Sequence, residues 1–442
     1  MKLSTVFVSG CLLTVAATAV ALAVIETPFP SSAAQRPPAM EPGLFADDPG
    51  HLWNRLHRVM HVRAAPGAQE HGFDEVDPLL WRETRYLLTE PSHSQAIRLL
   101  NEFLETGGER LITDPVKRAV FQHDLWAVFD WLAAPTDGNI DARKALMPRI
   151  ARVIRRVALR QEQIERLPDN YAAGVRSRAF APGFDPAQRD RQFLPPDLTT
   201  AGGPWVVISG NEPIAAQHAA EVSHSSFSIM WQVPGGQAPT LAYLKKLWDA
   251  PEPYVVDPPA SFDGERRVMI NPALPAVPSG THIALVRRML LIDQRGMVVP
   301  SPLTESIQLR VLQEREQSFF EFRIRRRPLF AGEAGGLRAI QPEDQAFFTF
   351  SSHGIDPFEG RAGSGPSRLP EILKGCRACH DQSGPRVQSI LSLRRLLKPY
   401  SQLDFRHPRW GRWFTQDNIA AEQKSRRADW GLLQGFWHSN PW

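Results

Sequence analysis

Two cysteines and a histidine near the C-terminal end of the sequence have the types and spacing needed for covalent haem attachment. They are Cys376, Cys379 and His380, in the run Gly-Cys-Arg-Ala-Cys-His. Two thiols three residues apart can add to the two vinyl groups on one edge of a porphyrin, and the adjoining imidazole can then take the proximal position on the iron. The spacing therefore indicates a c-type haem site.

This run resembles the attachment motif of the c-type cytochromes. The resemblance implies one covalent haem c, with Cys376 and Cys379 as thioether attachment points and His380 as the proximal iron ligand. Residues 369–374 read as a short helix that runs into the motif, as in monohaem cytochromes c. The Gly-Pro at 384–385 resembles the one whose proline carbonyl, in that family, accepts a hydrogen bond from the proximal histidine.

The second axial ligand departs from the pattern of that family. Monohaem cytochromes c usually supply a methionine downstream of the motif, and no methionine follows Met297. The distal position would then be empty, filled from elsewhere in the chain, or filled by one of the nearby histidines, which are His353, His407 and His438. We favour His353 as the distal ligand, because it lies on a predicted loop beside Gly354 and directly after an apolar run that reads as a strand. His407 is the second candidate.

Other interpretations of the Cys-x-x-Cys pair stay open. It could form a small-loop disulfide in an exported protein. A thioredoxin-like redox pair lacks the strand–helix unit that would precede it, and a zinc site would be short of ligands. The main alternative is therefore an exported binding or structural protein in which Cys376 and Cys379 form a disulfide and no haem is bound.

The N-terminus reads as an export signal. Lys2 supplies a minimal positive region, and the run from Leu3 to Ile25 is almost wholly apolar or small. Small-residue cleavage sites lie at 21–23 and 31–33, so the signal is assigned to residues 1–33. We expect a periplasmic or extracellular protein, with an uncleaved segment anchored to the outer face of the cytoplasmic membrane as the alternative. Residues 34–50, rich in proline and alanine, read as a flexible linker. Haem c is attached outside the cytoplasmic membrane, which agrees with export.

Size and charge limit the classes of partner. A chain of 442 residues with an ordinary hydrophobic fraction can form two or three domains. Its net charge of +4 is small and spread along the chain, so nucleic-acid binding is not indicated. A redox partner protein or a small-molecule substrate remains the expected partner, and the membrane would be met only through an uncleaved N-terminal segment.

Residues 51–170 read as a helical region, with helices predicted at 51–62, 94–105, 114–133 and 141–167. His57 and His61 stand four apart on one helix face, which is the spacing of paired metal ligands. No acidic partner accompanies them in that helix, so we expect a packed or solvated face. His123 and Asp124 lie inside the most apolar helix, where we expect a polar stripe or a satisfied buried pair.

Residues 171–350 read as a β-rich domain, either a sandwich or a curved sheet. Strand patterns cover 205–208, 227–233, 282–292, 307–311, 320–324 and 347–350, with a helix at 241–248. His218 and His224 lie near Glu221 and offer a candidate metal site, although histidines are common on loops. The three arginines at 325–327 are expected to form a solvated strand end.

Residues 351–442 form the predicted haem-binding segment, which is mainly helical and includes an amphipathic helix at 386–398 and many aromatic residues. The predicted fold is therefore α+β, with an N-terminal helical region, a central antiparallel β-rich domain and a C-terminal cytochrome c-like segment. The predicted function is that of an exported single-haem c-type protein, which transfers electrons or carries out haem-based redox chemistry. The residues do not decide whether it is an enzyme.

Overall fold

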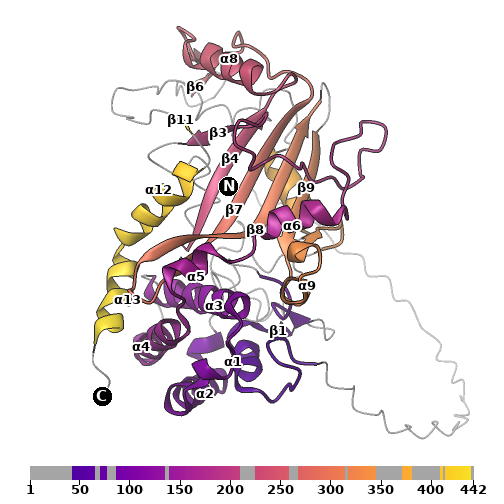
Figure 1. Cartoon of the computed structure of the whole chain (residues 1–442). Coiled ribbons are helices and arrows are strands. Elements are labelled where there is room, and N and C mark those ends of the chain that lie inside the picture. The colour runs from indigo at the N-terminus through magenta and orange to yellow at the C-terminus, as the bar shows by residue number, and fades with distance from the viewer. Residues whose placement is uncertain are drawn as a thin grey trace, which may run out of the picture. The chain divides into compact units, whose positions relative to one another are not determined.

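Helices fill the first part of the chain and antiparallel strands fill the middle, as Figure 1 shows, so the predicted α+β class is confirmed. The computed structural model describes residues 42–64, 70–76, 86–134, 139–209, 224–257, 267–313, 317–344, 371–380, 409–411 and 414–439. The early helices are α1 (Leu52–His61), η1 (Tyr86–Leu88), α2 (Ser92–Thr106), η2 (Gly108–Arg110), α3 (Pro115–Ala133), α4 (Ile140–Val157), α5 (Gln161–Glu165) and α6 (Asn170–Ser177).

Helix α3 is the centre of the helical layer, and local chemistry sets its start. The Asp114 side chain accepts a hydrogen bond of 2.8 Å from the backbone N–H of Lys117, and Pro115 occupies the first turn, where its missing N–H costs nothing. Most of α3 is buried, including Phe121 and Trp126. It packs between α1 and α4 on one side and the long strands on the other. A helix buried around its circumference must place its polar residues inside the protein.

The helix predicted over 141–167 is wrong in one respect, because the structure divides it into α4 and α5. The chain leaves the helix at Ala158, which adopts an extended backbone. Leu159 then forms an isolated bridge with Asp293, at the turn between two strands. The tertiary pairing of Leu159 therefore overrides the helical pattern of the sequence.

Seven antiparallel strands form the main sheet, in the order β10-β9-β8-β7-β4-β3-β11. Their bounds are β3 (Val206–Ser209), β4 (Ser225–Gln232), β7 (Thr281–Ile292), β8 (Val298–Leu312), β9 (Gln317–Ile324), β10 (Leu337–Ala339) and β11 (Arg409–Gly411). Two small sheets add β1 (Arg63–Ala64) with β2 (Glu70–His71), and β5 (Tyr254–Asp257) with β6 (Arg267–Ile270). The described strands thus give one large sheet and match the curved-sheet alternative of the prediction.

Register shifts in the β7–β8 pairing curve this sheet. They lie between Arg287 and Leu290, opposite Thr304 and Pro300. An irregularity of this kind bends a strand and increases its twist. One face of the sheet buries an apolar core with α6 and residues 193–198, and the other face packs against α8 (Gln237–Trp248) near one end.

The C-terminal helices join both layers. They are α12 (Phe414–Ser425) and α13 (Ala428–His438), which lie along the left edge of Figure 1. Trp430, Leu433 and Trp437 of α13 share a core with α3 and α4, and α12 packs against β4 and β8. The last part of the chain is therefore built into the same fold as the N-terminal helices, and β11 places it at the edge of the main sheet.

Two sequence expectations need correction. Residues 42–50 fall in the predicted linker, yet Phe45 is fully buried and its backbone N–H donates to Asn54 Oδ1 at 2.7 Å. Arg326, expected at a solvated strand end, is 1% exposed at the start of α9 (Arg326–Ala331). The predicted strand at 347–350 and helix at 386–398 lie outside the described residues, as do residues 1–41. No helix within the described ranges is long and apolar enough to cross a membrane.

Candidate functional site

The haem-attachment motif lies on α10 (Ile372–His380), one unbroken helix. The sequence predicted a short helix over 369–374 that runs into the motif, and α10 begins three residues later and continues through the motif. Positions 376, 379 and 380 are therefore spaced i, i+3 and i+4, which places them on one side of the helix. One helix therefore carries all three motif residues.

Helix α10 is fixed to the main sheet at its N-terminal end. Ile372 and Leu373 are buried together with Ile340, and the backbone N–H of Ile372 donates to Asp344 O at 2.9 Å. The helix packs against β9. The Sγ of Cys376, which is partly buried, lies 3.9 Å from Glu321 Oε2. The first thiol of the motif is therefore held at the surface of the sheet.

The sheet face below α10 is polar. In β9, Phe320 and Phe322 pack into the apolar core on the far face, so the alternating position Glu321 turns toward α10. Glu321 is 1% exposed and accepts a hydrogen bond of 2.6 Å from Arg323 Nε. Arginine on this face can balance the negative charge of haem propionates. The described surroundings of Cys376 therefore place charged groups beside the first thiol of the motif.

Several residues of the sequence hypothesis have no described position. His353, His407 and the Gly-Pro at 384–385 lie outside the described residues, and so do His218 and Glu221. The structure does describe His438, which is exposed at the end of α13. Its Nε2 lies 3.2 Å from Gln434 Oε1. That helix packs on α3, α4 and α12. The structure does not bring His438 to β9, where α10 lies.

A second group of chemically capable side chains lies buried between α1 and α3. His57, His61 and Asp124 each present one ligand-type atom, and these atoms all lie within 4.8 Å of one another. The two imidazole rings stack with centroids 5.3 Å apart. All three residues are buried, at 0%, 2% and 4% exposure. The sequence placed the two histidines on one helix face and predicted a packed or solvated face there. It missed the carboxylate, which comes from a different helix.

Burial keeps the two imidazoles of this cluster neutral. Desolvation lowers the pKa of His57 well below its ordinary value, and the positive charge of Arg326 lowers it further. The pKa of His61 is lowered in the same way, by burial first and then by the nearby His57 and Arg326. Neutral imidazole is the form that binds metal ions.

Arg326 positions the carboxylate of the cluster. Its Nη2 donates to both oxygens of Asp124, at 2.7 and 2.8 Å, and its Nε donates at 3.2 Å. Burial raises the pKa of Asp124, while the guanidinium opposes that rise. A buried bidentate pair of this kind fixes the orientation of the carboxylate. Arg326 also donates to backbone carbonyls of residues 72–75, which ties this segment to the cluster.

A polar network continues from this cluster toward the sheet. His123 Nε2 lies 2.9 Å from Glu305 Oε1, which also accepts a hydrogen bond of 2.7 Å from Ser225 Oγ. The ring of His224 lies against that of His123, and burial lowers the pKa of His224 to about 4. Asp130, 3.4 Å from His224 Nδ1, extends the network to α12. The sequence predicted a polar stripe or a satisfied buried pair at 123–124. Both side chains are buried, and each has its own partner, Glu305 for His123 and Arg326 for Asp124.

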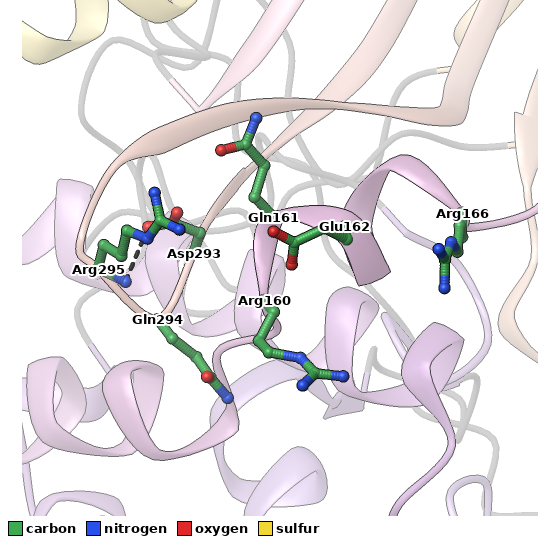
Figure 2. Close-up of a pocket in the computed structure, with 7 residues that line it drawn as sticks. All are labelled: Arg160, Gln161, Glu162, Arg166, Asp293, Gln294 and Arg295. Atoms are coloured by element: carbon green, nitrogen blue, oxygen red, sulfur yellow. Dashed lines mark hydrogen bonds between the residues drawn. The ribbon is translucent and has the colours of Figure 1, made fainter.

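A surface pocket of about 540 Å³ lies between α5 and the β7–β8 turn, as Figure 2 shows. Its lining is mostly charged and amide side chains, among them Arg160, Arg166 and Arg295. Asp293 accepts a hydrogen bond from the backbone N–H of Arg295, which Figure 2 draws as a dashed line, and a second one from the backbone N–H of Met297. Its carboxylate therefore stabilises the turn. This pocket contains none of the motif residues, and the buried carboxylate in its lining, Asp293, is bonded to the backbone of the turn.

No family model, curated protein or solved structure matches the chain. The two candidate sites therefore rest on this chain's own residues.

Proposed function

We propose that the protein is an exported single-haem c-type cytochrome-like protein. Cys376 and Cys379 would hold the haem through thioether bonds, and His380 would be its proximal ligand. The bound haem supplies electron transfer, or redox chemistry at an open iron position. The observation that carries the proposal is that one continuous helix, α10, bears the complete motif and is packed on the main sheet.

The surroundings of α10 support the same proposal. An electron-transfer group needs a rigid mount, because motion of the iron ligands adds to the reorganisation that accompanies each electron. The buried contacts of Ile372 and Leu373 hold α10 on β9. Glu321, beside Cys376, places a buried carboxylate near the attachment point, and Arg323 pairs with it. Charge near a haem is one of the means by which a protein sets its reduction potential.

Export remains part of the proposal. The apolar run from Leu3 to Ile25 would direct the chain across the cytoplasmic membrane, where haem c is attached. If the signal is cleaved, the purified protein begins between Val24 and Gln35. N-terminal sequencing that finds Met1 or Lys2 on membrane-bound protein would establish an anchor instead.

The alternative is a binding or structural protein in which Cys376 and Cys379 form a disulfide. The two hypotheses differ in the pyridine haemochrome spectrum of protein made together with the haem-attachment machinery. We expect the spectrum of one c-type haem per chain. The double variant Cys376→Ala, Cys379→Ala should lose it, whereas Cys11→Ala should retain it. A wild-type protein without the spectrum would contradict the proposal.

The partner follows from the chemistry of the group. A carrier would exchange electrons with a redox partner protein, and a catalyst would act on a small molecule at the iron. The helical layer and the sheet form a larger body than electron carriage requires, which favours an additional binding role.

A further inference from the structure

The buried cluster of His57, His61 and Asp124 has the composition of a metal centre. We propose that these residues bind a divalent first-row transition-metal ion, separate from the haem. Two imidazole nitrogens and one carboxylate oxygen suit zinc and ferrous iron, and no thiolate is needed.

The tautomer of His57 gives the first argument. Its Nε2 lies 2.9 Å from the backbone oxygen of Phe73, and because a carbonyl can only accept, the proton must be on Nε2. The lone pair on Nδ1 is then available. This atom is buried and has no hydrogen-bond partner within the described ranges. Metal-binding histidines commonly donate their second ring nitrogen to a carbonyl in this way.

The spacing of the two histidines gives the second argument. Residues four apart on a helix lie on one face, and in α1 that face turns toward α3. His61 lies in the final turn of α1, directly above His57, and its ring stacks on that of His57. A single ion can therefore meet both rings from the side on which Asp124 stands.

Arg326 orients the carboxylate of Asp124 but does not occupy all of its hydrogen-bond acceptor positions. Arg326 makes three hydrogen bonds to Asp124, two of them to Oδ2 and one to Oδ1. An ionised carboxylate has about four acceptor positions, so Oδ1 keeps one for an ion. Arg326 is thus a positioning residue, which holds the carboxylate in place and does not bind the metal.

The size of the cluster agrees with a first-row ion. The ligand-type atoms lie within 4.8 Å of one another. When zinc binds nitrogen at about 2.1 Å, its ligand atoms stand about 3.4 Å apart, so the ligand atoms need to approach one another by at most about 1.4 Å. Three protein ligands leave at least one coordination position open. This is the arrangement of catalytic zinc sites and of ferrous sites with two histidines and one carboxylate.

The test uses the full chain, treated with a chelator and then dialysed against Zn²⁺. Zinc is measured by elemental analysis, because the iron of a haem does not interfere with that reading. We expect one zinc per chain. His57→Gln and His61→Gln should each weaken zinc binding at least about a hundredfold. His93→Gln is the control, because His93 lies in the same helical layer on α2, with its Nδ1 bonded to Leu87 O, and it should bind like the wild type.

Two results would overturn the proposal. One is a wild-type chain that retains no zinc. The other is a pair of folded His57→Gln and His61→Gln variants that bind zinc as well as the control.

A second measurement keeps the test decisive if a variant does not fold. X-ray absorption at the zinc edge of the loaded wild-type protein should show nitrogen and oxygen neighbours with the scattering pattern of two imidazoles. Sulfur neighbours would overturn the proposal, because they would place the zinc at Cys376 and Cys379. Neither measurement depends on whether haem is bound, so failure here and failure of the haem proposal are distinguishable.

Discussion

Replacement of Lys424 by methionine should destabilise the protein strongly. Lys424 lies at the end of α12 with its side chain 1% exposed, and its Nζ is 2.9 and 2.8 Å from the two oxygens of Asp130 on α3. Methionine keeps the length and the apolar part of the side chain but removes the positive charge. Asp130 would then be a buried carboxylate without its main cation.

The size of the effect follows from the electrostatics of Asp130. Burial alone would raise the pKa of this carboxyl, yet Lys424 and His224 hold it well below its ordinary value. Removal of one partner from a buried ion pair costs about 3–5 kcal/mol, because the remaining charge is left without compensation. The exposed pair Lys245–Asp249 is the matched control, with lysine 75% exposed. Its loss should cost less than about 1 kcal/mol.

Urea unfolding at neutral pH measures these free energies. We expect Lys424→Met to lower the free energy of unfolding by at least about 3 kcal/mol and Lys245→Met to change it little, with similar m-values. The double variant Lys424→Met, Asp130→Asn should recover part of the loss, since residue 130 is then neutral and Asp429, the second partner of Lys424, keeps its ion pair with Arg427. If Lys424→Met is no less stable than Lys245→Met, the reasoning about this pair is refuted.

Three further predictions concern a turn, a buried histidine and the haem iron. Gly335 has φ +64° and a Cβ there would lie 1.8 Å from Asn170 O, whereas Gly332 has φ +72° and open space around it. Gly332→Ala should lower the free energy of unfolding by about 1–2 kcal/mol, and Gly335→Ala should lower it clearly more. Equal losses in the two variants would contradict the predicted clash. His224 has a folded-state pKa of about 4, below its ordinary 6.5, so its contribution is complete above pH 6.5 and is lost as the pH falls toward 4. Its loss amounts to about 3 kcal/mol, and His224→Gln should flatten the dependence of unfolding free energy on pH in this window. The methionine–iron band of oxidised cytochromes c should be missing from the visible spectrum. If His353 is the distal ligand, the iron should be low-spin and the variant His353→Ala should be high-spin. A high-spin wild-type protein would contradict histidine ligation.

Local chemistry explains which parts of the fold the sequence could predict. The start of α3 was predictable because Asp114 and Pro115 act within one turn. Strands β3, β4, β7 and β9 and the last part of β8 were predictable from their apolar side chains, which alternate in β9 at Phe320 and Phe322. Strands β10 and β11 at the two edges of the sheet were not predicted. The interruption of the helix between α4 and α5 was not predictable, since it depends on the pairing of Leu159 with the distant Asp293.

The candidate sites divide in the same way. The haem motif is visible in the sequence because its three residues are neighbours along the chain. The third member of the His57 cluster could not be predicted, because Asp124 reaches it only through the packing of α3 on α1. Arg326 was misjudged for the same reason: a run of arginines suggests solvent, and only the fold supplies the buried carboxylate that neutralises one of them.

The intact mass of the exported, purified protein tests the central claim most directly. With haem attached through Cys376 and Cys379, the mass should exceed that of the processed polypeptide by one haem and should not change under denaturing conditions. The double variant with alanine at both positions should lack this increment. A wild-type mass equal to the polypeptide less two hydrogens would contradict covalent haem and establish the disulfide.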